Sequence, residues 1–463
     1  MSLEVELPAV LTDTLTDTLA DQAVALAAGD SPPRIALRGD LLDFTSKPEW
    51  GVVESPAVRF REDHWLLIED GRIVGAQPGD QPPDSSWVLR DHRGQLVMPG
   101  FIDTHVHSPQ LDVIASHGTE LLDWLNTYTF PAERRYGDLV EAEAGAARFL
   151  DALLSHGTTS AVVFPTVHKV SADSLFAAAH ERGMRLITGK VLMDRHAPEG
   201  LCDEAPDFGA KDCVDLIDRW HGVDRLAYAV TVRFAPTSTP SQLAMAGQLC
   251  TAYPAVYMQT HLAENRAEVK WVHELFPEAR SYLDVYERAG LLNARGVFAH
   301  GIWLDDADRA SLRDNCAQIS HSPSSNLFLG SGLFNWRAAE DAGVAVSVAT
   351  DVGGGTSLSM QRTLSDAYKV QALQGERLTA WRALHGATLG PAAALGLGDE
   401  IGSLSTGCTA DVCVWDWALG PVAQRRHELA QALHERVFAW LTLSDDRNLV
   451  TAYVKGAVRY ERA

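Results

Sequence analysis

Eight short apolar runs alternate with helix-period segments through the middle of this 463-residue chain. Such alternation is typical of parallel βα units, and eight units are the number that closes a (β/α)8 barrel of the TIM type. The runs predicted as strands are 95–104, 158–165, 185–193, 226–234, 256–261, 296–300, 317–321 and 344–350. Helical periodicity between them is clearest at 139–155, 171–182, 241–253, 282–289 and 308–315. The sequence therefore predicts an α/β fold built on a barrel.

The two ends of the chain have a different pattern. Between residues 34 and 97 short apolar runs are separated by turn signals, and Asp70-Gly71 predicts a hairpin. Similar runs return at 410–415 and 449–454. We expect both ends to share one small β-sandwich domain. The predicted division begins with a partly disordered N-terminal extension at 1–33. The first part of the sandwich follows at 34–97, the catalytic barrel at 98–396 and the second part of the sandwich at 397–463.

Composition excludes several classes of partner. The formal net charge is -22, from 39 basic and 61 acidic residues, and it repels phosphate backbones and anionic membrane surfaces. Six cysteines without C-x-x-C spacing favour reduced thiols in a cytoplasm. The acidic stretch 1–29 does not have the pattern of a signal peptide, and no run reaches the roughly 20 apolar residues of a membrane span. We expect a cytoplasmic protein that binds neither nucleic acid nor membrane.

Polar side chains follow the predicted strands at the same end of each. They are His105 and His107 after the first strand, Arg233 at the end of the fourth, His261 and Glu264 at and after the fifth, His300 at the sixth, His321 at the seventh and Asp351 after the eighth. In a barrel the carboxyl ends of the strands meet at one mouth, where the chemistry of such folds takes place. Independent structural roles would not place every one of these residues at the same end. The pattern therefore predicts a single site.

Four of these side chains suit a metal ion. His105 and His107 stand at i and i+2 of an extended segment and point the same way. With His261 and Asp351 they offer nitrogen and oxygen ligands without thiolate, which is typical of a catalytic rather than a structural site. Zinc is the expected ion, one per chain, and Fe²⁺ would accept the same ligands. Taken singly, a His-x-His pair is more often half-buried structure, and an aspartate after a strand is usually a cap or turn residue.

Five segments carry a resemblance to a known family. They are 98–110 (MPGFIDTHVHSPQ), 233–237 (RFAPT), 259–265 (QTHLAEN), 321–332 (HSPSSNLFLGSG) and 350–355 (TDVGGG). Together they resemble the amidohydrolase superfamily and, within it, the guanine deaminases. The first segment is specific only to the superfamily, whereas the second and fourth are much narrower.

The resemblance implies a set of site residues. The metal ligands would be His105, His107, His261 and Asp351. The residues in contact with purine would be His107, Ser108, Pro109, Gln110, Arg233, Phe234, His261, Glu264 and Asp351. Relatives with two metals carry a carboxylated lysine at the end of the fourth strand, where this chain has Arg233. We therefore expect one metal, and relatives are commonly homodimers.

The implied reaction is hydrolytic deamination of guanine to xanthine and ammonia in purine catabolism or salvage. Glu264 would move protons from water to the leaving nitrogen, Asp351 would hold the metal and orient the water, and His300 would polarise the attacked centre. The guanidinium of Arg233 matches the O6 and N7 acceptors of guanine.

Three other hypotheses compete with guanine deamination. The chain could deaminate or hydrolyse another aminated heterocycle, such as an adenosine-like, pterin or triazine ring. A non-catalytic protein on the same scaffold would be expected to lose metal ligands, and all four are present. A base-flipping deaminase of the other zinc class would need H-x-E with P-C-x-x-C, and neither motif occurs.

Overall fold

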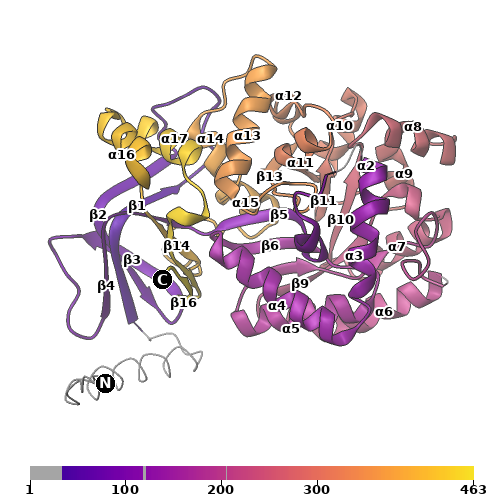
Figure 1. The fold of residues 1–463 in the computed structure, drawn as a ribbon, viewed down its shortest axis with the longest axis horizontal. Helices are drawn as coiled ribbons and strands as arrows, with labels where there is room; N and C mark the ends of the chain where they lie inside the picture. Colours follow the sequence, from indigo (N-terminus) through magenta and orange to yellow (C-terminus); the bar gives the residue numbers. More distant parts are fainter. Residues whose placement is uncertain (1–33, 118–120, 205) are drawn as a thin grey trace, which may run out of the picture.

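The structure is a computed structural model that describes residues 34–117, 121–204 and 206–463. Its strands form two sheets, one from the two ends of the chain and one from the middle (Figure 1). The predicted extension 1–33 lies outside the described residues. None of the helices within them is long and apolar enough to cross a bilayer. The domain boundaries after residues 97 and 396 stay a prediction.

The end sheet has seven strands in the order β16-β15-β14-β4-β1-β2-β3. All its neighbouring pairs are antiparallel except β1 with β4. The predicted hairpin is confirmed, since Glu69 pairs with Arg72 and both turn residues have positive φ, 49° at Asp70 and 74° at Gly71. The strands are β1 Arg34–Phe44, β2 Val58–Glu69, β3 Arg72–Pro78, β4 Val88–Pro99, β14 Val412–Trp415, β15 Leu449–Val454 and β16 Ala457–Glu461. The prediction that both chain ends build one small β domain is confirmed, and within the described residues the strands of this domain form a single seven-stranded sheet rather than two.

The barrel sheet is parallel throughout, in the order β13-β12-β11-β10-β9-β7-β6-β5, with β8 also paired to β9. Sequential strands are neighbours, as the barrel prediction requires, and the fold class is confirmed. The strands are β5 Phe101–His107, β6 Thr158–Phe164, β7 Arg185–Thr188, β8 Val191–Leu192, β9 Leu226–Val232, β10 Tyr257–Leu262, β11 Gly296–His300, β12 Gln318–His321 and β13 Ala345–Val348.

Two of the predicted strands are interrupted. The run 95–104 is divided at Gly100 into β4 of the end sheet and β5 of the barrel, because the chain changes sheets there. The run 185–193 is divided into β7 and β8 around Gly189, where a Cβ would lie 2.0 Å from the carbonyl oxygen of Ala229. Periodicity does not reveal such breaks, because the residues on both sides are equally apolar.

The segment after β13 closes the barrel against β5. The Asp351 N–H donates to the His105 carbonyl at 2.9 Å, and the His107 N–H donates to the Val352 carbonyl at 3.0 Å. The buried Asp103 carboxyl also accepts from the Thr350 N–H at 3.1 Å, and burial raises the pKa of Asp103 to about 6. These bonds place the carboxylate of Asp351 beside the two histidines of β5.

Helices surround the barrel on its outer side (Figure 1). Helix α4 has the bounds predicted from its periodicity, and the other predicted helices begin or end within two residues of the observed ones. The helices are α2 Leu121–Trp124, α3 Phe130–Arg135, α4 Leu139–Ser155, α5 Lys169–Arg182, α6 Pro206–Trp220, α7 Pro240–Ala252, α8 Arg266–Leu275, α9 Tyr282–Arg288, α10 Asp306–Asp314, α11 Pro323–Phe328, α12 Trp336–Asp341, α13 Met360–Leu373, α14 Ala380–His385, α15 Leu389–Ala394, α16 Gly420–Leu429 and α17 Leu433–Leu443. Shorter turns are η1 Ser108–Val113, the π-helical η2 Leu125–Thr129, η3 Ala235–Thr237 and η4 Asp446–Asn448.

The end sheet contacts the barrel at the amino end of β9. Arg225, the residue before β9, donates through both terminal nitrogens to the carboxylate of Asp411, and one of them also donates to the Gly183 carbonyl at 2.9 Å. Nearby, the rings of Phe101 and Trp415 lie 5.7 Å apart. An ion pair buried within an apolar joint thus links the two sheets.

Candidate active site

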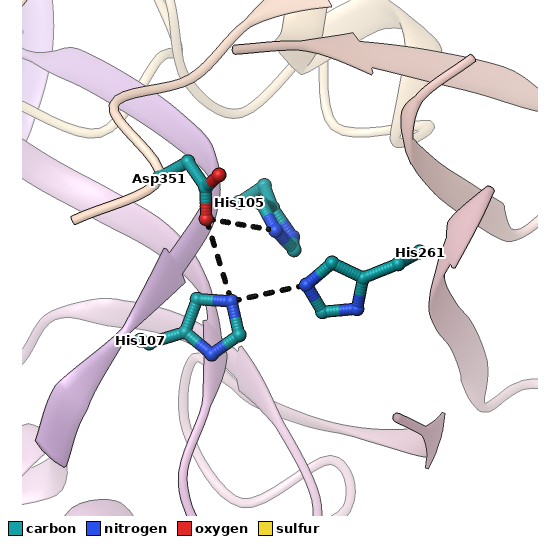
Figure 2. Close-up of side chains that lie close together, drawn as sticks. All are labelled: His105, His107, His261 and Asp351. Carbon is teal, nitrogen blue, oxygen red and sulfur yellow. Dashed lines mark hydrogen bonds and ion pairs between the residues drawn. The ribbon is translucent and has the colours of Figure 1, made fainter. Parts of the chain in front are cut away.

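Three histidines and one aspartate meet at the carboxyl end of the barrel (Figure 2). His105 and His107 lie in β5, His261 lies in β10, and Asp351 follows β13. Their ligand atoms all lie within 4.8 Å of one another. Asp351 Oδ1 is 3.2 Å from His105 Nε2 and 3.4 Å from His107 Nε2, and the Nε2 atoms of His107 and His261 are 3.2 Å apart. The structure thus brings the four predicted ligands together.

The charge and hydrogen bonding of this cluster suit a divalent cation. Burial lowers the pKa of His107 to about 3 and that of His261 well below its usual value, so both rings are neutral at neutral pH. His261 Nδ1 donates to the Arg233 carbonyl at 2.6 Å, which leaves its Nε2 as an electron-pair donor. His105 Nε2 is buried and lies 3.2 Å from the Asp351 carboxylate. Neutral imidazoles around a carboxylate are ligands that a divalent transition metal ion accepts.

A pocket opens beside the cluster. Its polar lining consists of His107, Gln110, Arg233, His261, Glu264, Glu268, His300 and Asp351. The apolar lining consists mainly of Trp124, Leu125, Phe234 and Leu329. A small concave site with apolar walls and a few convergent polar groups is the usual form of a small-molecule site.

Glu264 lies in this pocket, three residues after His261. Its Oε1 accepts from the Ser331 hydroxyl at 2.8 Å, and its Oε2 is 3.6 Å from His300 Nε2. Burial, and then the negative charge of Asp351, raises the pKa of Glu264 to about 8. A carboxyl group that titrates near neutrality can both accept and donate a proton during one reaction.

His300 lies between the two carboxyl groups. Its Nε2 is 3.7 Å from Asp351 Oδ2, and its Nδ1 donates to Asn326 Oδ1 at 2.8 Å. The residue ends β11 with a φ of 70°, a left-handed conformation that histidine adopts uncommonly. The bond to Asn326 orients the ring so that Nε2 faces the pocket.

The predicted purine-contacting residues fall into two groups. Arg233, Phe234 and Gln110 line the pocket, together with Glu264 and with three of the predicted metal ligands, His107, His261 and Asp351. Ser108 and Pro109 are buried in the η1 turn and are not part of the lining, so their contact with a ligand stays a prediction.

Sequence reasoning missed several residues of the site. Glu268 lines the pocket and belongs to a capping box with Asn265 at the start of α8, an N-x-x-E signal that is visible in the sequence. Leu125 comes from η2 and lines the pocket, and the fully buried Glu133 comes from α3. Both lie between β5 and α4, away from any strand end, and no sequence signal marks them. By sequence alone Trp124 of α2 could line the mouth of the barrel or pack in the core, and it lines the pocket.

Residues 96–459 match the model of the amidohydrolase family. The chain is 45% identical to guanine deaminase of Escherichia coli (strain K12) over 431 residues, which are 92% of this chain and 98% of that relative. A solved structure of E. coli guanine deaminase matches with a TM-score of 0.88 and 44% identity over 93% of this chain and 100% of that chain. Guanine deaminase of C. acetobutylicum, solved with bound guanine in the active site, matches with a TM-score of 0.83 and 26% identity over 92% of this chain and 99% of that chain.

Proposed function

The chain belongs to the amidohydrolase family, and from that premise we propose that it is an enzyme that hydrolyses guanine to xanthine and ammonia. The observation that carries the proposal is 45% identity to a guanine deaminase over nearly its whole length. The pocket supports it, because a buried carboxyl, a histidine and an arginine surround a cluster of metal-ligand type.

We propose one zinc ion per chain, held by His105, His107, His261 and Asp351, with Fe²⁺ as the alternative ion. When bound, such an ion supplies a Lewis acid that makes water a nucleophile at neutral pH. The four neutral or anionic donors and the absence of a thiolate among them support this assignment.

Glu264 moves the protons of the reaction. Water adds to C2 of guanine, and Glu264 accepts the water proton and passes it to a ring nitrogen. The second proton of the same water, now on the C2 hydroxyl, passes to the exocyclic nitrogen. Ammonia then leaves as the C2–N bond breaks and the C2 carbonyl of xanthine forms. The pKa of about 8 supports this role, since a relay of this kind works best when the pKa lies near the operating pH. His300, between Glu264 and Asp351, polarises the attacked centre.

Arg233 recognises the edge of guanine that carries O6 and N7. A guanidinium offers paired donors that match two adjacent acceptors. Gln110 contacts the purine edge, and Phe234 covers a ring face; both line the pocket. Phe234 is itself supported by Trp271, whose ring centroid lies 6.2 Å away.

The cellular setting follows from the reaction. We propose that the enzyme acts in the cytoplasm, in purine catabolism or salvage, as a homodimer that binds neither nucleic acid nor membrane. The net charge of -22 supports the last two points, because it repels polyanions and anionic lipid.

The proposed function is tested by measuring the turnover of several aminated rings. The purified protein is incubated with guanine, adenine, cytosine and a pterin, and released ammonia is measured while metal content is determined on the same sample. We expect ammonia from guanine and about one zinc per chain. Turnover of one of the other rings without guanine would favour the alternative, a related amidohydrolase of another aminated heterocycle.

A further inference from the structure

Glu133 is a buried carboxylate that neither the predicted chemistry nor the pocket lining uses. It belongs to α3 and its side chain is 0% exposed. Its Oε1 accepts from Arg233 Nη1 at 2.7 Å and from Gln110 Nε2 at 3.3 Å. One carboxylate oxygen therefore holds both of the side chains proposed to read the purine.

The pair with Arg233 is needed electrostatically. Arg233 is only 3% exposed, and a buried guanidinium without a counter-ion is strongly unfavourable. Within the described residues, Glu133 is the carboxylate that forms an ion pair with it. The same contact holds Nη1 of the guanidinium beside Glu133, and Arg233 lines the pocket.

The contact with Gln110 fixes an amide that could otherwise point either way. Gln110 Oε1 accepts from the Gly353 N–H at 3.1 Å, while its Nε2 faces Glu133. A flipped amide would set its oxygen against the carboxylate and its NH2 against an N–H donor. Glu133 and Gly353 together allow one orientation.

We propose that Glu133 is a positioning residue that sets the specificity for guanine by holding Arg233 and Gln110 in reading position. The inference rests on the proposed function and deepens it. Glu133 does not contact the substrate; it acts through the two residues that it binds. Loss of the Glu133 carboxylate therefore lowers kcat/KM most for the substrates that make the most contacts with Arg233.

The experiment compares guanine with 2-aminopurine, which has the same C2 amine but no O6. In Glu133→Gln the carboxylate charge is lost while the shape is kept. We expect kcat/KM for guanine to fall by about 10²-fold, through KM more than kcat, because recognition groups are misplaced. For 2-aminopurine, which keeps N7 but lacks O6, kcat/KM falls by a smaller factor, so the ratio of guanine to 2-aminopurine falls below that of the wild type.

The matched control is Asp411→Asn, which removes the partner of Arg225, another buried arginine, at the joint with the end sheet. It lowers stability like Glu133→Gln but leaves the ratio of guanine to 2-aminopurine unchanged. A folded Glu133→Gln with the wild-type ratio, or with equal losses on both substrates, overturns the proposal.

A second variant keeps the proposal testable if Glu133→Gln does not fold. Glu133→Asp keeps the charge beside Arg233 but withdraws the carboxylate by one methylene, so it cannot reach both partners. We expect near-normal stability and a ratio between those of the wild type and Glu133→Gln, and an unchanged ratio overturns the proposal. Wild-type turnover is measured first, and a wild type that does not deaminate guanine rejects the proposed function. If the wild type is active but the ratio of the two substrates does not change in the variants, only the role of Glu133 is rejected.

Discussion

Strand β9 has a buried arginine at each end, and the two arginines have different surroundings. Arg225, before the strand, pairs with Asp411 in the joint between the barrel and the end sheet. Arg233, after the strand, pairs with Glu133 and also lines the pocket. Both pairs are almost fully removed from solvent.

The ion pair at the amino end of β9 serves stability, whereas the arginine of the pair at the carboxyl end also lines the pocket. At the amino end both terminal nitrogens of Arg225 donate to Asp411, and one of them also donates to the Gly183 carbonyl. At the carboxyl end the strands open into connecting loops, so a paired arginine still has donors facing a pocket. This division of labour is general in (β/α)8 barrels. Substitutions at one end or the other test this separation.

The largest effect is expected from the metal ligands at the carboxyl end. Asp351→Ala removes the anionic ligand, so metal content falls and guanine turnover drops to the background rate. Metal analysis and ammonia release measure both. Treatment of the wild type with a chelator should have the same effect, reversed by added zinc; turnover that survives full removal of metal would contradict the assignment.

The next effect is expected at Glu264. Glu264→Gln keeps the size of the side chain but cannot take up a proton, so kcat falls by about 10²–10⁴-fold. Metal content stays at the wild-type level, because Glu264 is not one of the clustered ligands. Steady-state kinetics with metal analysis on the same sample check this. A variant with full activity would remove Glu264 from the mechanism.

A comparable change at the amino end should affect stability alone. Asp411→Asn leaves Arg225 buried without its counter-ion, which lowers the free energy of unfolding by about 3–5 kcal/mol. Urea titration measures the loss. The kcat and KM for guanine stay at the wild-type values at temperatures where the variant is folded, and a changed KM would break the separation between the two ends.

The smallest effect at neutral pH is expected at His385, where a helix of the barrel contacts the end sheet. His385 of α14 packs edge-on against Phe44 of β1, and burial, then Arg382 and Lys47, lowers its pKa from 6.5 to about 3. A folded pKa below the unfolded one stabilises the fold above pH 6.5, and this contribution is lost as pH falls from 6.5 toward 3. His385→Gln should therefore reduce the slope of stability against pH in that window by about 1.4 kcal/mol per pH unit.

Denaturant titrations of the wild type and His385→Gln at several pH values between 4 and 8 measure this slope. Above pH 7 the two proteins should differ by a constant amount. Identical slopes below pH 6.5 would show that His385 is not buried as a neutral ring. Guanine turnover at pH 7.5 serves as the control and should not change.

The sequence predicted the parts of the site that lie at strand ends. His105, His107, His261 and Asp351 each stand next to an apolar run, and the barrel topology alone implies that such positions converge. Strand boundaries were less accurate where a glycine breaks an apolar run, as at Gly100 and Gly189. Apolar periodicity reports burial, and burial continues across these breaks.

The chain by itself therefore determined the class of fold and the four side chains of the candidate metal site, because both follow from patterns that repeat with each strand. Only the tertiary structure decided which buried carboxylate stands behind Arg233. Glu133 lies in a helix that joins β5 to α4, 100 residues away along the chain, and the two are brought together by folding. A buried charge needs a partner nearby in space, and distance along the sequence does not reveal which one it is.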